Sequence, residues 1–305
     1  VLIGTSFSTS NETRSSAFDM FRNNRLAVAD RLANERYEGE SIPRYDVNSL
    51  PPEDNAAPID SPANPNNSYR KTTLANNGYP VGFGKNSQTV LLPAFLAAYT
   101  GNSANHVSLD IFRNFPIPNW AIKYNGLMRY EFFKKTFKRF SLQQNYRASY
   151  TVNSFRSNFN YTKDPNGQDD SGNFYSPTIM SNVTLVEQFN PLVRVDFELK
   201  NSFKLLTQIN KDRALSMSFD NNLLTEVHGI EYVVGLGYRI KDVTFSSKLA
   251  DNPTGVIKSD INIKADLTYR DSQTIVRYLD YDNNQLGGGQ NIWTLNTTAD
   301  YSLSK

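Results

Sequence analysis

The chain has 305 residues with 32 Lys+Arg and 30 Asp+Glu, so it is almost neutral and long enough for a large core or two domains. Neutrality gives no reason to expect nucleic acid as a partner, and the absence of cysteine excludes disulfides and thiolate chemistry. The longest apolar run, residues 90–99, is about half the roughly 20 residues of a spanning helix, and Pro93 interrupts it. A mean hydropathy of −0.52 would suit a soluble chain, but transmembrane β-barrels give the same weak signal.

The first 118 residues are predicted to hold one strand and a long insertion. Residues 1–10 have a strand-like pattern with no initiator Met or secretion signal, and we interpret them as a barrel strand at the start of a fragment. Residues 11–118 differ from the rest and are predicted to form an inserted cap or lumen element. Within them, helical spacing with Ser15 or Ser16 as N-cap predicts a helix, on the basis of Phe18, Phe21, Arg25, Val28 and Leu32.

Two further segments belong to this insertion. Six prolines between Pro43 and Pro65 predict an extended or mobile loop. The stretch "GFGKNSQTVLLPAFLAAYTG", residues 82–101, predicts a glycine-rich turn followed by a short apolar helix from Pro93 to Tyr99, with Pro93 near its first position and Gly101 at its end.

Residues 119–305 are predicted to be antiparallel barrel strands. In "RFSLQQNYRASYTV", residues 139–152, apolar residues occupy even positions and polar residues odd ones, which is the period of a strand. Further along, the apolar residues occupy odd positions instead, at Phe155 and Phe159, and this change predicts a bulge near Asn153.

Residues 192–210 are predicted to form one strand of 19 residues, longer than globular strands usually are, which favours a barrel wall over a soluble sandwich. Its odd positions are the predicted lipid-facing residues: Val193, Val195, Phe197 and Leu199. Its even positions are the predicted lumen-facing residues: Arg194, Asp196, Glu198 and Lys200.

Later connections are predicted to alternate between short and long, as in outer-membrane barrels. Short turns are expected at the three polar pairs Lys211–Asp212, Lys241–Asp242 and Asp271–Ser272, and longer loops at 222–229, 251–257 and 282–291. Aromatic residues near strand ends fit either membrane-interface belts or a soluble core, and composition leaves both open.

Catalytic and metal-binding motifs are weak. His228 lies near Ser216, Ser218, Asp220 and Glu226, the residue types of a hydrolase triad, but a polar loop histidine explains it more simply. The stretch from Asp280 resembles a calcium loop, yet Gln285 stands where glycine is required. The phosphate-loop spacing is absent around Gly82 and Gly84. No enzyme activity, cofactor or metal is therefore predicted.

Five stretches carry a resemblance to a known family: "FRNNRLAVADRL" (21–32), "GFGKNSQTVLLPAFLAAYTG" (82–101), "PIPNW" (116–120), "SFDNNLLTEVHG" (218–229) and "GLGYRIKDV" (235–243). Together they resemble the C-terminal part of the SprA/Sov family, the outer-membrane translocon of the type 9 secretion system of Bacteroidota, which also serves gliding motility.

The resemblance implies an all-β fold, namely one stretch of the wall of a very large antiparallel transmembrane barrel, in the bacterial outer membrane. The barrel would pass folded cargo proteins to the cell surface. Its implied partners are that cargo, plug-like and β-barrel accessory proteins, outer-membrane lipid and the remaining strands of the same barrel. Two alternatives stay open: a surface-exposed β-sandwich adhesin or binding protein, and an outer-membrane hydrolase.

Overall fold

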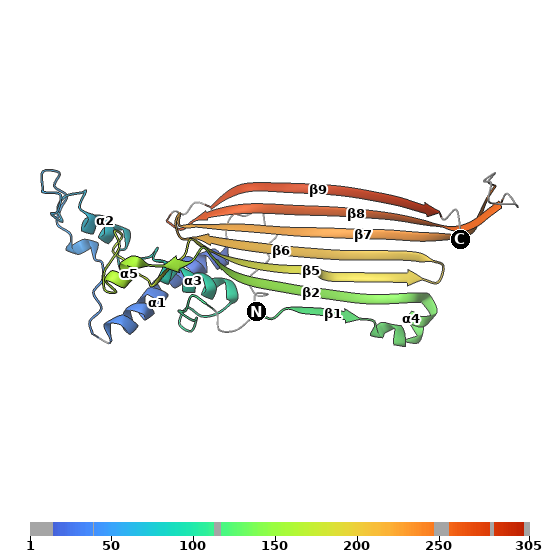
Figure 1. The fold of residues 1–305 in the computed structure, drawn as a ribbon, viewed down its shortest axis with the longest axis horizontal. Coiled ribbons are helices and arrows are strands. Elements are labelled where there is room, and N and C mark those ends of the chain that lie inside the picture. Colours follow the sequence, from blue (N-terminus) through green and yellow to red (C-terminus); the bar gives the residue numbers. More distant parts are fainter. Residues whose placement is uncertain (1–14, 39, 113–116, 247–255, 281–283, 302–305) are drawn as a thin grey trace.

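The computed structural model describes residues 15–38, 40–112, 117–246, 256–280 and 284–301, and its main feature is one long antiparallel sheet with most of the helices at one end (Figure 1). Seven strands lie in the order β1-β2-β5-β6-β7-β8-β9. Their bounds are β1 Trp120–Tyr124, β2 Phe137–Asn153, β5 Asn182–Leu199, β6 Phe203–Ser218, β7 Leu223–Ser246, β8 Val256–Tyr278 and β9 Asn284–Tyr301. The expected antiparallel all-β fold is thus confirmed, whereas residues 1–10 lie outside the described residues.

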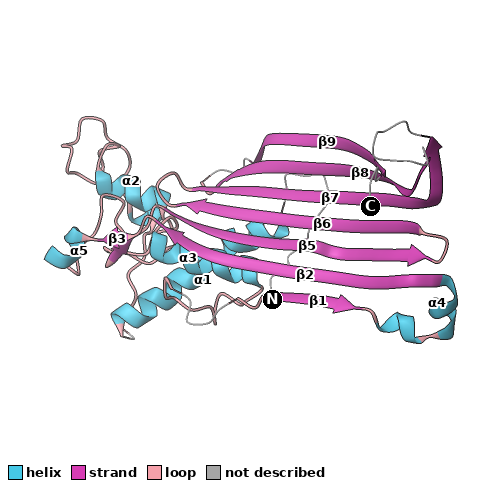
Figure 2. Ribbon diagram, turned by 45° about the vertical axis from the view of Figure 1, so that its right-hand side comes forward, coloured by secondary structure: helices cyan, strands magenta, loops and turns pink. Residues whose placement is uncertain are grey.

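Helices and a small second sheet gather at one end of the long sheet (Figure 2). These elements are α1 Ser16–Tyr37, η2 Val47–Ser49, α2 Ser68–Ala75, α3 Gln88–Thr100, β3 Arg156–Ser157, α5 Phe159–Lys163 and β4 Thr178–Ile179. At the opposite end, η3 Gly126–Arg129 and α4 Glu131–Thr136 connect β1 to β2. Among the described residues, no helix is both long and apolar enough to cross a membrane.

The strand boundaries differ from those that the sequence pattern predicted. The predicted strand 192–210 is wrong, because Leu199 ends β5, residues 200–202 form a turn, and Phe203 begins β6. Ser202 has a positive φ of 68° there, and the Asn201 side chain accepts a hydrogen bond from the Phe203 N–H at 3.1 Å. A three-residue turn keeps odd positions on one face of both strands, so the alternation continues through the turn and conceals it.

The predicted short turns at Lys211–Asp212 and Asp271–Ser272 are also wrong. Both pairs lie inside strands, β6 and β8, and Lys241–Asp242 lies within β7 at a register irregularity. Asp212 pairs with Arg270 of β8 at 2.9 Å, so its charge is satisfied on the sheet surface without a turn. The predicted loop 222–229 is mostly β7, and the glycines of 282–291 lie within β9.

The bulge predicted near Asn153 is wrong as well, since β2 ends at Asn153 and Ser154 takes a positive φ of 53°. The register shift in β2 lies earlier, between Gln143 and Tyr146. Phe155 lies in the loop after β2 and Phe159 begins α5, so neither residue continues the alternation of β2. Within 139–152 the predicted alternation is confirmed, because even residues pair with the odd residues of β5.

The first predicted helix is confirmed as α1, with Ser15 as its N-cap: the Ser15 side chain accepts a hydrogen bond from the Phe18 N–H at 3.3 Å. The apolar helix α3 is longer than predicted. It begins at Gln88, so Pro93 lies inside the helix rather than near its first position, while Gly101 ends it with a φ of 73°. Burial of every side chain from Val90 to Thr100 offsets the backbone hydrogen bond that Pro93 cannot donate.

Residues 154–181 join the N-terminal segment in space. The Phe174 ring packs against Phe83 at 5.4 Å, and the Tyr45 hydroxyl donates to the Gly172 carbonyl at 2.9 Å. Gly82, at a φ of 85°, has no space for a side chain because Phe174 lies against it. We call residues 15–112 together with 154–181 the helical unit. The proline-rich stretch is part of it, and Arg70 donates to the Pro51 carbonyl at 2.6 Å.

Candidate functional site: a sheet with one apolar and one polar face

The strand registers sort the side chains of the long sheet into two faces. Val193 pairs with Ile209, Ile209 with Tyr232, Tyr232 with Tyr269, and Tyr269 with Trp293, so these five residues form a row on one face. We call this the apolar face. The register shift in β5 between Phe189 and Val193 leaves odd residues on the same face throughout that strand. The predicted lipid-facing residues Val193, Val195, Phe197 and Leu199 all lie there.

An uncovered apolar band occupies the part of this face farther from the helices. Along β8 it runs from Ile261 to Tyr269, which at about 3.3 Å per residue is about 26 Å. That length is close to the roughly 25 Å apolar band of outer-membrane barrels, and a strand tilt of about 40° would reduce its height to about 20 Å. Large side chains of the band are exposed, among them Leu236 at 45%, Leu267 at 42% and Leu295 at 67%.

Aromatic rings border the band on both sides. Toward the helices, Trp120 stacks on Tyr146 at 4.2 Å, Tyr146 contacts Phe189 at 4.8 Å, and Tyr269 contacts Trp293 at 4.5 Å. Toward the other end, ring pairs 5.1–6.2 Å apart join Phe133, Phe137, Phe140 and Phe197. Aromatic rows at two levels of an apolar band are typical of membrane interfaces.

The opposite face, which we call the polar face, carries acidic and basic side chains that are joined in ion pairs. Asp196 accepts from Arg139 at 2.8 Å and from Arg194 at 3.3 Å, and Glu198 pairs with Lys138 at 2.7 Å. Three of the four predicted lumen-facing residues, Arg194, Asp196 and Glu198, therefore share this face. The fourth, Lys200, lies in the turn after β5 rather than on the strand.

One ion pair of the polar face crosses over a neighbouring strand. Arg270 of β8 reaches Asp212 of β6 at 2.9 Å across β7, where Gly229 pairs with Asp212 on one side and, on the other, with Ser272, two residues from Arg270. A Cβ at Gly229 would come within 2.9 Å of both the Arg270 guanidinium and the Asp212 carboxylate. The absence of a side chain at Gly229 thus permits a contact that ties three strands together.

The helical unit covers the other part of the apolar face. In this part, charged residues occupy some of the strand positions whose side chains lie on the apolar face. Glu187, between Leu185 and Phe189, pairs with Arg213 at 3.0 Å, and the two side chains are only 1% and 5% exposed. The Tyr146 hydroxyl donates to the same carboxylate at 3.0 Å. Sequence reasoning missed this pair, although a charged residue among alternating apolar ones was a signal for it.

A second buried pair, Arg277 with Glu226 at 2.8 Å, repeats this arrangement two strands away. Both arginines face aromatic rings of the helical unit: Arg213 lies over Tyr99 at 5.9 Å, and Arg277 over Phe18 at 5.4 Å. Burial raises the pKa of the Tyr99 phenol, which stays neutral against them. The charged pairs are thus shielded by α1 and α3, and they fix where the helical unit sits on the sheet.

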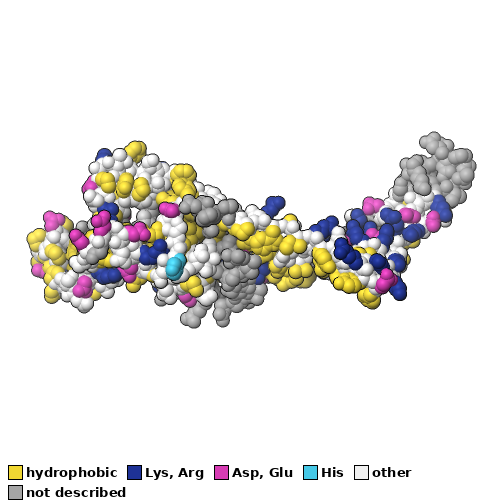
Figure 3. Space-filling model, turned by 90° about the horizontal axis from the view of Figure 1, so that it is seen from below, with side chains coloured by type: hydrophobic (Ala, Val, Ile, Leu, Met, Phe, Trp, Pro, Cys, Tyr) yellow, Lys and Arg dark blue, Asp and Glu magenta, His cyan; other side chains and the backbone are white. Residues whose placement is uncertain are grey.

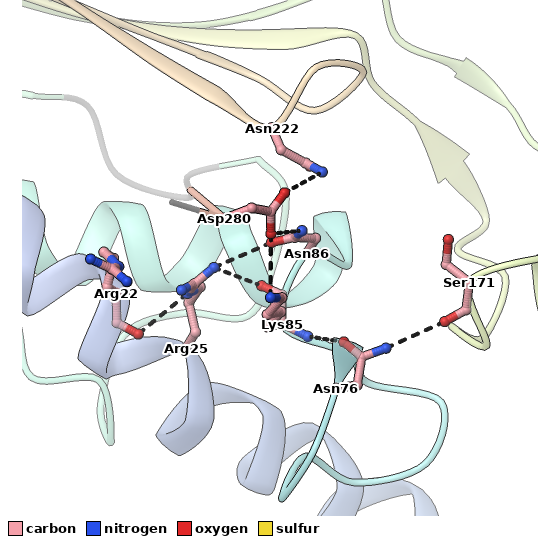
Figure 4. Close-up of polar contacts among 8 residues, drawn as sticks. All are labelled: Arg22, Arg25, Asn76, Lys85, Asn86, Ser171, Asn222 and Asp280. Atoms are coloured by element: carbon pink, nitrogen blue, oxygen red, sulfur yellow. Dashed lines mark hydrogen bonds and ion pairs between the residues drawn. The ribbon is translucent and has the colours of Figure 1, made fainter. Parts of the chain in front are cut away.

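The "GFGKNS" loop links the helical unit to the end of the sheet (Figure 4). Asp280, after β8, pairs with Lys85 at 3.4 Å and accepts from the Asn86 amide at 2.6 Å. Arg25 of α1 donates to the Asn86 side chain at 3.2 Å, and burial lowers the pKa of its guanidinium. The loop therefore makes structural contacts with its backbone and side chains, and Asp280 serves the same junction.

The structure brings His228 close to one acidic residue but not to either candidate serine. His228 pairs with Arg213 on the side covered by the helical unit, and its Nδ1 lies 4.0 Å from Glu226. Ser216 pairs with Thr225, so its side chain lies on the polar face, as does that of Ser218. Within the described residues there is also no cluster of three or more His, Cys, Asp or Glu that could hold a metal.

No protein-family model matches the chain, and no curated protein matches it either.

Proposed function

We propose that this chain is a segment of the wall of a large outer-membrane β-barrel that conducts proteins to the cell surface. The observation that carries the proposal is the apolar band, about 26 Å long on β8, bordered by aromatic rows and backed by a charged face. In Figure 3, hydrophobic side chains gather along the middle of the molecule, and Lys and Arg gather toward the end away from the helices. Lipid against the apolar face and water against the polar face would accommodate both kinds of side chain.

Strand length and edges support a wall. The 24 residues of β7 extend about 80 Å, so the sheet would project well beyond the bilayer. β9 pairs with β8 along one side, and within the described residues no strand pairs with its other edge, where about half of its 18 residues point their backbone N–H and C=O groups outward. A long unpaired edge promotes aggregation, and the remaining strands of a barrel would pair with its backbone donors and acceptors.

In this arrangement the helical unit lies outside the lumen. It covers the same face that bears the apolar band, but at a different level, so it would rest beside the membrane surface rather than inside the pore. The 154–181 connection lies at the same end of the long sheet as the rest of the helical unit, and the short 200–202 turn lies at the opposite end. Among the described connections of the long sheet, 154–181 is the longest, and because outward loops of these barrels are longer than periplasmic turns, it favours the cell-surface side for the helical unit; the short 219–222 connection on the same side and the helix-containing 125–136 connection at the opposite end do not follow this rule.

The resemblance to the SprA/Sov family supplies the finer proposal, the type 9 secretion translocon. Secreted cargo, plug-like and β-barrel accessory proteins, outer-membrane lipid and the rest of the barrel are its proposed partners. The polar face would serve as a hydrated lumen surface, and paired charges of both signs would leave it weakly adhesive to cargo of either charge. The proposed role is transport and requires no catalytic group.

Site-directed cross-linking tests this function. In the full-length protein, a photo-cross-linker is attached to Asp196→Cys on the polar face, with Val195→Cys, the adjacent residue on the apolar face, as control. During secretion we expect Asp196→Cys to form adducts with secreted proteins and Val195→Cys to form adducts with lipid. Active secretion with no cargo adduct at Asp196→Cys would contradict the proposal.

A further inference from the structure

We infer that the tip of the β1–β2 hairpin, residues 125–138, is an anchor for phospholipid headgroups. This inference rests on the proposed function, because it assumes that the apolar band faces lipid. The tip comprises η3, α4 and the first residues of β2, and it lies at the end of the sheet opposite the helical unit (Figure 1).

Exposed aromatic side chains are the first feature of the tip. Tyr130, the N-cap of α4, is 63% exposed, and Phe132 within α4 is 69% exposed. Phe132 contacts Phe133 at 5.6 Å, and Phe133 stacks on Phe137 at 5.5 Å. Phe133 also meets Phe140 edge to face at 5.2 Å. The rings of the tip therefore continue the aromatic row that borders the apolar band.

Positive charge is the second feature. The tip contains four basic residues, Arg129, Lys134, Lys135 and Lys138, and one acidic residue, Glu131. Lys138 pairs with Glu198 on the polar face, and Lys134 is 3.8 Å from Glu131. Arg129, Lys134 and Lys135 are all exposed. Figure 3 shows Lys and Arg gathered at this end of the molecule, next to the hydrophobic side chains.

Together these features match a lipid headgroup region. Aromatic rings are favoured at the level between acyl chains and water, and lysine stems lie along apolar surface while their ammonium groups reach phosphate. Because the rings of the tip are continuous with the band, the lipids whose acyl chains cover the band would present their phosphates at the level of Lys134 and Lys135. A phospholipid surface thus fits both the position and the charge of the tip.

Depth-dependent quenching tests the inference. The full-length protein is placed in nanodiscs containing anionic and zwitterionic phospholipid, with a fluorophore on Tyr130→Cys or Leu267→Cys. Nitroxides are carried either on the headgroup or at the middle of the acyl chain. We expect Tyr130→Cys to be quenched mainly by the headgroup nitroxide and Leu267→Cys mainly by the mid-chain nitroxide.

Charge reversal supplies the second arm. The double variant K134E/K135E should lower headgroup quenching at Tyr130→Cys roughly two-fold, because each basic residue near an anionic surface contributes to binding. The matched control K71E/K163E reverses two exposed lysines of the helical unit and should leave it unchanged.

The possible failures are distinguishable. If Leu267→Cys is quenched by the mid-chain nitroxide but Tyr130→Cys by neither, the tip stands in water or against a protein, and the inference is overturned while the proposed function stands. Headgroup quenching that is equal in K134E/K135E and in the control also overturns it. If Leu267→Cys is unquenched as well, the proposed function fails with it.

Discussion

The apolar face has two halves that share strands and alternation but differ in what covers them. In the half away from the helices, Val193, Leu236 and Leu295 are at least 45% exposed. In the other half, Leu185, Leu215 and Met217 are buried beneath α1 and α3, together with the Glu187–Arg213 and Glu226–Arg277 pairs. The alternation of apolar and polar residues along a strand indicates which side chains share a face. Charged residues in the apolar phase report where that face is covered by protein, because acyl chains could not accommodate them.

The largest effect is expected where the helical unit covers the sheet. Glu187→Leu would leave Arg213 buried without its carboxylate, and we expect a loss of about 3–5 kcal/mol in the free energy of unfolding. Asp242→Asn, which breaks the exposed Lys258–Asp242 pair, is the control and should cost less than about 1 kcal/mol. Denaturant unfolding of the full-length protein in detergent measures both. Equal losses would show that the Glu187–Arg213 pair is not shielded.

The next effect concerns the uncovered half. Leu267→Arg would place a charge on the apolar band and should cost about 2–4 kcal/mol of folding into a bilayer. Thr268→Arg, its neighbour on the polar face, should cost little. The folded fraction after reconstitution into vesicles, followed over a denaturant series, measures the difference. A similar cost at both positions would contradict the assignment of the two faces.

A smaller effect is expected on the polar face. Gly229→Ala would crowd the Asp212–Arg270 pair and should destabilise the sheet by about 1 kcal/mol. Gly288→Ala is a suitable control, because no atom lies within 4 Å of a Cβ at that position of β9. Thermal unfolding of both variants makes the comparison. A loss no greater than that of the control would show that the pair adjusts without cost.

The sequence was sufficient for the fold class, the α1 helix with an N-cap at Ser15 or Ser16, and the face of each residue from Val193 to Glu198. Local patterns could not locate the turns, because the 200–202 turn preserves the alternation and because Asp212 and Ser272 are polar without being turn residues. The contact of residues 154–181 with the helical unit joins Phe174 to Phe83 and Gly172 to Tyr45, and no local pattern encodes such distant pairs. The buried Glu187–Arg213 pair likewise depends on which strands become neighbours.

Lipid quenching along β5 tests the central claim most directly. The chain contains no cysteine of its own, so single cysteines at positions 193–198 of the full-length protein can carry a fluorophore in membranes with nitroxide-labelled acyl chains. We predict quenching at 193, 195 and 197 and none at 194, 196 and 198. Quenching of the even positions, or of neither set, would show that the apolar band faces another protein surface or water, and would contradict the proposed barrel wall.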